Sequence, residues 1–173
     1  MKTFLGLGCL CLASSVMADV GDLPPGFRYP NRSDYQGQWQ EYAQAGTPIP
    51  CHVRADFDGN GVEDDAWILI GTMPTDWKVV VFMRRKLGKP TVVDLEQTGS
   101  SDEPVWKVGL FPIKRGKHTI VCATNYPPCT PGRKVDFIFK NPGLRTETLE
   151  INAAVYIWDQ KKGSFLVLAN EGE

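Results

Sequence analysis

From Cys51 to residue 169 the chain is a succession of short β-forming segments, and no other feature constrains its fold as strongly. The segments are rich in Val, Ile, Phe and Trp, and Gly, Pro, Asn and Asp separate them. The predicted strands cover 51–56, 66–73, 77–87, 91–97, 105–111, 118–123, 134–140, 148–158 and 165–169. This pattern predicts a mostly β (α+β) fold of antiparallel sheets, sandwich-like or a propeller fragment, because a complete propeller needs far more chain.

Three of these segments indicate their own place in the sheets. Residues 77–83 are nearly all apolar, which favours a central strand covered on both faces. Residues 135–140 alternate between apolar and polar side chains, which favours a strand with one exposed face. Residues 154–158 and 164–168 flank a polar turn, so we expect a C-terminal hairpin.

One helix is expected before the strands, over residues 34–45. Ser33 is a suitable N-cap and Gly46 a suitable stop. Three aromatic residues fall on one face of this helix: Tyr35, Trp39 and Tyr42. Such a stripe usually docks a lone helix onto a sheet, and we expect that role here rather than a ligand-binding face.

The first 18 residues have the pattern of a secretory signal peptide. Lys2 precedes a short apolar run, and Val16-Met17-Ala18 is a suitable cleavage site. The apolar run is too short for a membrane span. We therefore expect cleavage after Ala18, a single domain over 19–173, and a periplasmic or secreted protein with no membrane span.

The charge of the chain after this cleavage is nearly balanced. Removing Lys2 leaves 18 basic and 20 acidic residues, for a net charge of −2. A protein that binds nucleic acid through phosphate contacts normally carries a strong basic patch. The charge therefore gives no support to nucleic-acid binding.

Three cysteines remain after cleavage: Cys51, Cys122 and Cys129. An oxidising compartment favours a disulfide between Cys122 and Cys129, which enclose a short Pro-rich loop. Cys51 is then left over, either buried and inert or paired with another chain in a structural envelope protein. A zinc site that adds His52 and His118 is the alternative, but the spacing matches no standard zinc motif.

The loop inside this expected disulfide has the character of a recognition loop. Its residues 125–128 read Asn-Tyr-Pro-Pro, and a disulfide would hold Tyr126 on a rigid backbone. A rigid aromatic tip is favourable for binding a protein partner because little conformational entropy is lost. A purely structural hairpin closure explains the same residues equally well.

The sequence contains no recognised catalytic motif. Nucleophile-elbow, zinc-protease and phosphate-loop patterns are absent from the 173 residues. A pair of facing carboxylates, as in glycosidases, cannot be established from sequence. We therefore expect a protein that is not an enzyme, with a calcium-dependent envelope hydrolase as the alternative.

Two short basic runs occur near predicted turns, at 84–86 and 114–117. Such runs commonly serve solubility and protect the edges of sheets from pairing with other chains. We expect both basic runs to have these roles.

The strongest local motif is acidic, at residues 56–65, Asp-Phe-Asp-Gly-Asn-Gly-Val-Glu-Asp-Asp. Oxygen-bearing side chains recur at every second position, and two glycines allow the backbone to curl around a point. Ca²⁺ prefers six to eight oxygen ligands, so this spacing predicts a calcium loop. The expected ligands are Asp56, Asp58, Asn60, the Val62 carbonyl and Asp64.

An EF-hand and a metal-free turn are the alternatives to this calcium loop. An EF-hand needs a bidentate Glu at its twelfth position, and here that residue is Trp67. The flanks also read as strands rather than helices. An ordinary metal-free turn explains the Asp, Asn and Gly residues, but it leaves five acidic side chains close together with no cation to offset their repulsion.

The stretch 55–66 resembles the calcium loop of FG-GAP or VCBS-type repeats. The ending, residues 154–165, is similar to the final hairpin of small exported bacterial proteins that carry one such loop. The resemblance covers roughly 50–169. It implies calcium ligands at Asp56, Asp58, Asn60, Val62 and Asp64. Integrin-like proteins contain several copies of this motif, whereas this chain contains one.

Among such exported proteins, the chain is similar to periplasmic immunity proteins that inhibit lysozyme-like secreted toxins. The resemblance implies a calcium-stabilised inhibitor of a peptidoglycan-degrading enzyme. It implies a protein partner that contacts exposed loops, Tyr126 among them.

Overall fold

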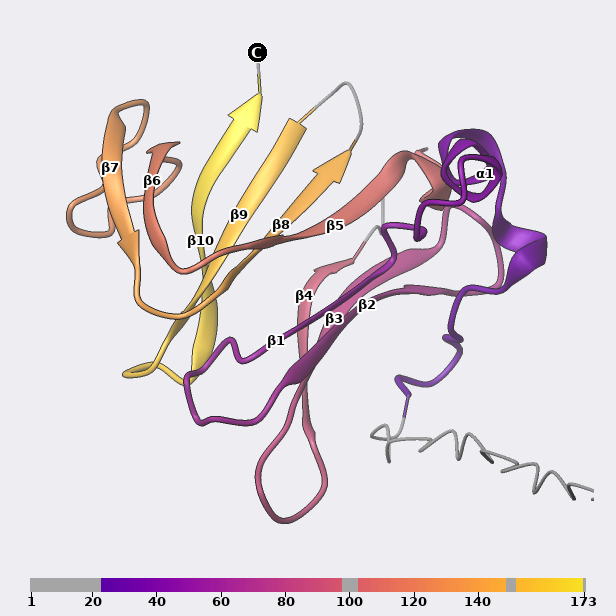
Figure 1. Cartoon of the computed structure of the whole chain (residues 1–173), viewed down its shortest axis with the longest axis horizontal. Helices are drawn as coiled ribbons and strands as arrows, with labels where there is room; N and C mark the ends of the chain where they lie inside the picture. Colours follow the sequence, from indigo (N-terminus) through magenta and orange to yellow (C-terminus); the bar gives the residue numbers. More distant parts are fainter. Residues whose placement is uncertain (1–22, 98–102, 149–151, 173) are drawn as a thin grey trace, which may run out of the picture.

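The computed structural model describes residues 23–97, 103–148 and 152–172 (Figure 1). The elements in chain order are η1 (Arg32–Asp34), α1 (Gly37–Gln44), β1 (His52–Ala55), β2 (Asp64–Ile70), β3 (Trp77–Met83), β4 (Thr91–Gln97), η2 (Val105–Lys107), β5 (Val108–Ile113), β6 (Gly116–Val121), β7 (Lys134–Phe139), β8 (Gly143–Thr148), β9 (Asn152–Asp159) and β10 (Ser164–Gly172). The predicted signal peptide lies outside the described residues.

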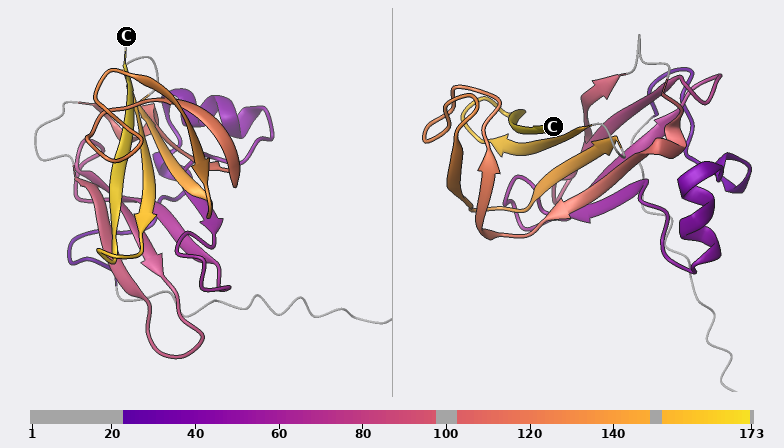
Figure 2. Two further views of the ribbon diagram at one scale, coloured as in Figure 1. Left: turned by 90° about the vertical axis from the view of Figure 1, so that its left-hand side faces the viewer. Right: turned by 90° about the horizontal axis from the view of Figure 1, so that it is seen from above.

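The strands form three antiparallel sheets. The first has the order β1-β2-β3-β4, the second the order β10-β9-β8-β5, and β6 pairs with β7 in a separate hairpin. The sheets do not close into a barrel. Figures 1 and 2 show the two four-stranded sheets splayed apart at one end, with the β6–β7 hairpin beyond β10. The predicted mostly β fold with antiparallel sheets and one α-helix is confirmed.

Strand β3 is central, as predicted, and it is buried along its whole length. Its alternate side chains enter different cores, because successive strand residues point to opposite faces. Val79 and Val81 join the main core between the two large sheets. Val80 and Phe82 join a second core on the outer face, which the N-terminal segment covers with Phe27 and other apolar residues.

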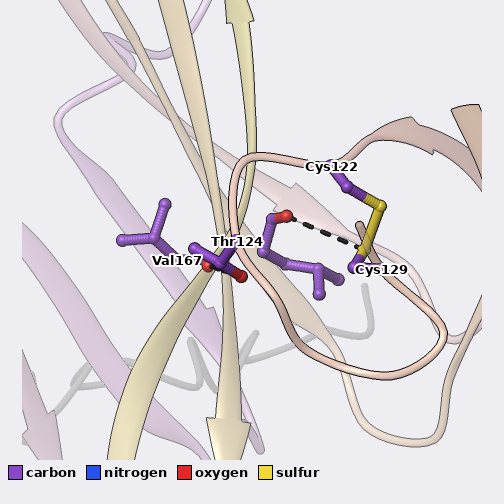
Figure 3. The surroundings of a disulfide bond; sticks show 5 residues. Cys122, Thr124, Cys129 and Val167 are labelled. Atoms are coloured by element: carbon purple, nitrogen blue, oxygen red, sulfur yellow. Dashed lines mark hydrogen bonds between the residues drawn. A yellow bond between two sulfur atoms is a disulfide. The ribbon is translucent and has the colours of Figure 1, made fainter. Parts of the chain in front are cut away.

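A third core lies between the second sheet and the β6–β7 hairpin, where Phe139 meets Val155 and Leu168. The predicted disulfide joins Cys122 to Cys129 at the edge of this core. Figure 3 shows it beside β10, where the Thr124 hydroxyl donates to the Val167 carbonyl at 3.0 Å. The disulfide closes the loop after β6 on itself, and hydrogen bonds from the Ala123 amide and the Thr124 hydroxyl to β10 hold this loop against the second sheet.

The helix is shorter than predicted. It begins at Gly37 rather than residue 34, because a separate turn of 3₁₀ helix, capped by Asn31, ends at Asp34. Gly37 has φ +48° and lies against the ring of Trp106, where a side chain would collide. The docking role is confirmed for Trp39, which is fully buried and whose Nε1–H donates to the Val108 carbonyl at 2.8 Å. Tyr35 precedes the helix, and Tyr42 is only half-buried.

Three strand predictions were wrong in detail, and one strand was missed. The segment predicted over 77–87 ends as β3 at Met83, and the segment predicted over 148–158 includes the last residue of β8 as well as most of β9. Residues 105–107 form a 3₁₀ turn before β5, which begins at Val108. Strand β8 was not predicted, because its alternating Gly, Leu, Arg and Thr residues carry too little apolar signal. It nevertheless lies inside the second sheet, between β5 and β9. Within the described ranges, no helix has both the length and the apolar character needed to cross a bilayer.

Candidate metal centre

The acidic loop connects β1 to β2 and brings three carboxylates together. Ligand oxygens of Asp56, Asp58 and Asp64 lie within 4.8 Å of one another. Gly59 and Gly61 adopt φ values of +75° and +83°, which only glycine adopts readily, and these reversals curl the loop. The sequence motif therefore folds into the compact acidic cluster that it predicted.

Side chains inside the loop fix its backbone. The Asn60 and Gly61 amides donate to Asp58 Oδ1 and to Asp56 Oδ2, each at 3.0 Å. The Val62 amide donates to Asn60 Oδ1 at 2.7 Å. These short-range bonds hold the loop in one conformation, which lowers the entropy lost when a ligand binds.

Asp64 is the buried member of the cluster, with no exposed surface. Burial raises its pKa to about 6, against the lowering effect of hydrogen bonds from the Arg84 and Phe57 amides. The neighbouring Asp58 and Asp56 carboxylates raise the pKa further. A cation at this position would lower the pKa of Asp64, because it stabilises the ionised carboxylates and offsets both burial and the repulsion from Asp56 and Asp58.

Asp56 supplies the clearest sign of an incomplete environment. Its Oδ1 is shielded from solvent and receives no hydrogen bond from the described residues. Buried carboxylate oxygens are normally paired, because an unpaired buried acceptor costs roughly 1–3 kcal/mol. The donor set consists of oxygens, which suits a hard cation such as Ca²⁺, Mg²⁺ or Mn²⁺.

The loop is tied to two distant parts of the chain. The Arg84 amide donates to Asp64 Oδ1 at 2.7 Å, and Asn60 Nδ2 donates to the Arg84 carbonyl at 2.8 Å. Gln160, in the turn between β9 and β10, donates to the Asp58 carbonyl at 2.9 Å. The loop therefore joins the first sheet to the second at one end of the molecule.

The four predicted side-chain ligands thus divide into two groups. Asp56, Asp58 and Asp64 converge. The side chain of Asn60 instead bridges Asp58 and Arg84 through Nδ2, while its Oδ1 accepts from Val62. Arg84 and Gln160 complete the surroundings and could not be found from the sequence, because they lie outside the motif.

Asp65, next to Asp64, belongs to a different cluster. It faces the opposite side of the first sheet, where His52, Arg54 and Arg84 surround it at 2.6–2.9 Å. Burial alone would raise its pKa, but hydrogen bonds from His52 and Arg54 and the charge of Arg84 leave the pKa lowered. His52 also stacks on Trp67, with ring centroids 3.9 Å apart. This arrangement is a structural ion cluster.

The zinc alternative does not fit the structure. Cys122 and Cys129 are joined in a disulfide, and His118 bonds the Lys114 carbonyl. Cys51 is free and buried in the main core, with 7 % of its surface exposed, and burial raises its pKa to about 11. A thiol in that position is inert, which disfavours pairing with another chain.

A pocket of about 480 Å³ adjoins the acidic loop. Phe57, from the loop, forms part of its wall, and the predicted contact residue Tyr126 lies in its lining. Other lining residues are Phe137, Phe139, Asn141, Trp158 and Gln160. The pocket is large enough for a small ligand or a partner's side chain, and it combines aromatic rings with amide groups.

Comparisons with protein-family models, with curated proteins and with solved structures give no match to this chain. The site must therefore be interpreted from its own geometry.

Proposed function

We propose that this chain is an exported, calcium-stabilised binding protein and that it inhibits a peptidoglycan-degrading enzyme in the manner of an immunity protein. The calcium ion would be held by Asp56, Asp58 and Asp64. The Val62 carbonyl would be a further ligand, and so would Asn60 once its Oδ1 turns from the Val62 amide toward the ion. The ion would neutralise three clustered carboxylates and lock the loop against its neighbours. It would have a structural role.

One observation carries the binding part of this proposal: the acidic loop and the aromatic pocket share a wall. Phe57 belongs to the loop and lines the pocket, and Gln160 lines the pocket while donating to Asp58. Asn141, also in the lining, lies against Gly59. A cation in the loop would therefore stiffen a surface that is suited to contact a partner.

The described residues favour binding over catalysis. The Nε2 atoms of His52 and His118 are engaged with Asp65 and the Lys114 carbonyl. His52 also lies across the sheet from the acidic cluster, so it is not placed to act with a metal-bound water there. The partner class rests on the resemblance of the loop and of the C-terminal hairpin to small exported inhibitors, since fold alone does not give function.

A capture experiment tests the proposal. The chain cleaved after Ala18 is immobilised and exposed to envelope extracts and to purified muramidases and amidases, in calcium and then in EDTA. The proposal expects one hydrolase to be retained in calcium, released in EDTA and inhibited when bound. Failure to retain or inhibit any of these enzymes would contradict it.

A further inference from the structure

The loop between β3 and β4, residues 84–90, is a second candidate surface. It projects beyond the strand ends at the bottom of Figure 1, and the left view of Figure 2 shows the same projection. Four of its seven residues are basic. Leu87 at the tip is 89 % exposed, and Gly88 beside it, with φ +97°, makes the reversal that presents it.

The base of this loop is fixed to the acidic loop. The Arg84 carbonyl accepts a hydrogen bond from Asn60, and the Arg84 amide donates one to Asp64. The Arg84 guanidinium pairs with Asp65 at 2.6 Å. Three contacts at one residue set the direction in which the loop leaves the sheet. The tip is thus presented from a rigid base, which lowers the entropy cost of binding.

The second basic run differs from this loop because its side chains contact other parts of the chain. In residues 114–117, Arg115 donates to the Lys140 carbonyl and Lys117 pairs with Asp136. Arg115 and Lys117 therefore already have partners within the chain. Arg85 and Lys86 are exposed, and neither forms an ion pair with the part of the chain that the structure describes.

We propose that the loop 84–90 docks onto an acidic protein segment whose apolar side chains cover Leu87. Exposed cations speed association with an acidic partner, while a central apolar side chain contributes the burial that sustains binding. This inference concerns a different surface from the pocket, and it holds whether or not the partner is a peptidoglycan hydrolase.

An anionic membrane is less well matched to the loop. The acidic loop lies at the base of the projection, and Glu63 is exposed there, outside the cluster of three carboxylates. A flat anionic surface would bring this carboxylate toward the headgroups and repel it. A narrow polypeptide segment can engage the tip alone.

The test uses a defined acidic polypeptide, a random copolymer of glutamate and tyrosine, and vesicles of phosphatidylglycerol and phosphatidylcholine as the membrane probe. Binding of the chain cleaved after Ala18 is measured by surface plasmon resonance in calcium at several salt concentrations. Arg85→Glu with Lys86→Glu reverses the tip charge. Arg133→Glu with Lys134→Glu makes the same net change at the start of β7, at the opposite end of the molecule in Figure 1.

The proposal expects salt-sensitive binding to the copolymer that the tip reversal weakens by about tenfold or more and the control reversal by about twofold or less. Leu87→Ser should weaken binding without changing its salt dependence. Thermal unfolding at the wild-type temperature shows that each variant is folded. Absence of copolymer binding, equal loss in both reversed variants, or preferential binding to the vesicles would overturn the proposal.

Discussion

The Arg84 backbone amide donates a hydrogen bond to Asp64 Oδ1 at 2.7 Å, joining the residue after β3 to the first residue of β2. Asp64 thereby belongs to two structures at once: it is a member of the acidic cluster and it holds the base of the β3–β4 loop. A change in the charge of Asp64 is therefore expected to alter both the acidic cluster and the base of the β3–β4 loop.

Replacing Asp58 should abolish the response to calcium. Asp58→Ala removes one of the three converging carboxylates, so calcium would no longer raise the unfolding temperature. For the wild type, calcium at about 100 times its dissociation constant should stabilise the fold by about 2.7 kcal/mol. Thermal unfolding in calcium and in EDTA measures this. Asp136→Ala, in an exposed carboxylate on β7, should keep the response, and a calcium shift retained by Asp58→Ala would refute the ligand assignment.

Acidity should act in opposite directions without and with calcium. The pKa of Asp64 is raised to about 6 by burial, whereas an unfolded Asp titrates near 4. Between pH 4 and pH 6, Asp64 is therefore protonated in the metal-free folded state and ionised in the unfolded state. Asp64 contributes stability below about pH 4, and this contribution of roughly 2–3 kcal/mol is lost as the pH rises through 6.

Calcium binding requires the ionised carboxylate, so stabilisation by calcium should instead grow as the pH rises through 6. Urea unfolding of the wild type and of Asp64→Asn, from pH 4.5 to 7.5 in EDTA and in calcium, separates this group from the other acids. The difference between the two proteins should fall with pH in EDTA and rise in calcium. A difference independent of pH would disprove the role of Asp64.

Removing the disulfide should destabilise the fold without disturbing the acidic loop. Cys122→Ala with Cys129→Ala opens a loop whose ends are seven positions apart. The chain-entropy model gives a loss of roughly 2–3 kcal/mol in the free energy of unfolding. Urea unfolding measures the loss, and reduced wild type should match the variant. The calcium shift should persist, since neither cysteine lies in the acidic loop.

Cys51 should be unreactive in the folded protein. Its side chain is buried and its pKa is raised to about 11 by that burial, so little thiolate is present at neutral pH. A thiol reagent should modify Cys51 only after denaturant is added, and non-reducing electrophoresis of the cleaved chain should show a monomer. Rapid modification in the native state, or a covalent dimer, would contradict this.

The sequence predicted the parts of the fold that local chemistry controls. The central position of β3 follows from its continuous apolar run, and the disulfide follows from two cysteines around a short loop. Strand β8 was missed because interior position, rather than composition, makes it a strand. The helix start was misplaced because Gly37 adopts a positive φ beside Trp106, and that contact is not local in sequence.

The same division holds for the candidate site. The spacing of Asp56, Asp58 and Asp64 was sufficient to predict that they converge. The pairing of Asn60 with Arg84 was not predictable, since it depends on the register of β2 against β3. The separation of Asp64 from Asp65 onto opposite faces follows from strand alternation, but only once β2 is known to begin at Asp64.

The hydrogen bond from Gln160 to the Asp58 carbonyl spans 102 positions of the chain. During synthesis the whole acidic motif emerges before β3, and Gln160 follows only after β9. The loop would therefore acquire its final surroundings late in folding, because contacts between distant segments form after local ones. A chain halted before residue 160 would carry every predicted ligand and still lack the finished site.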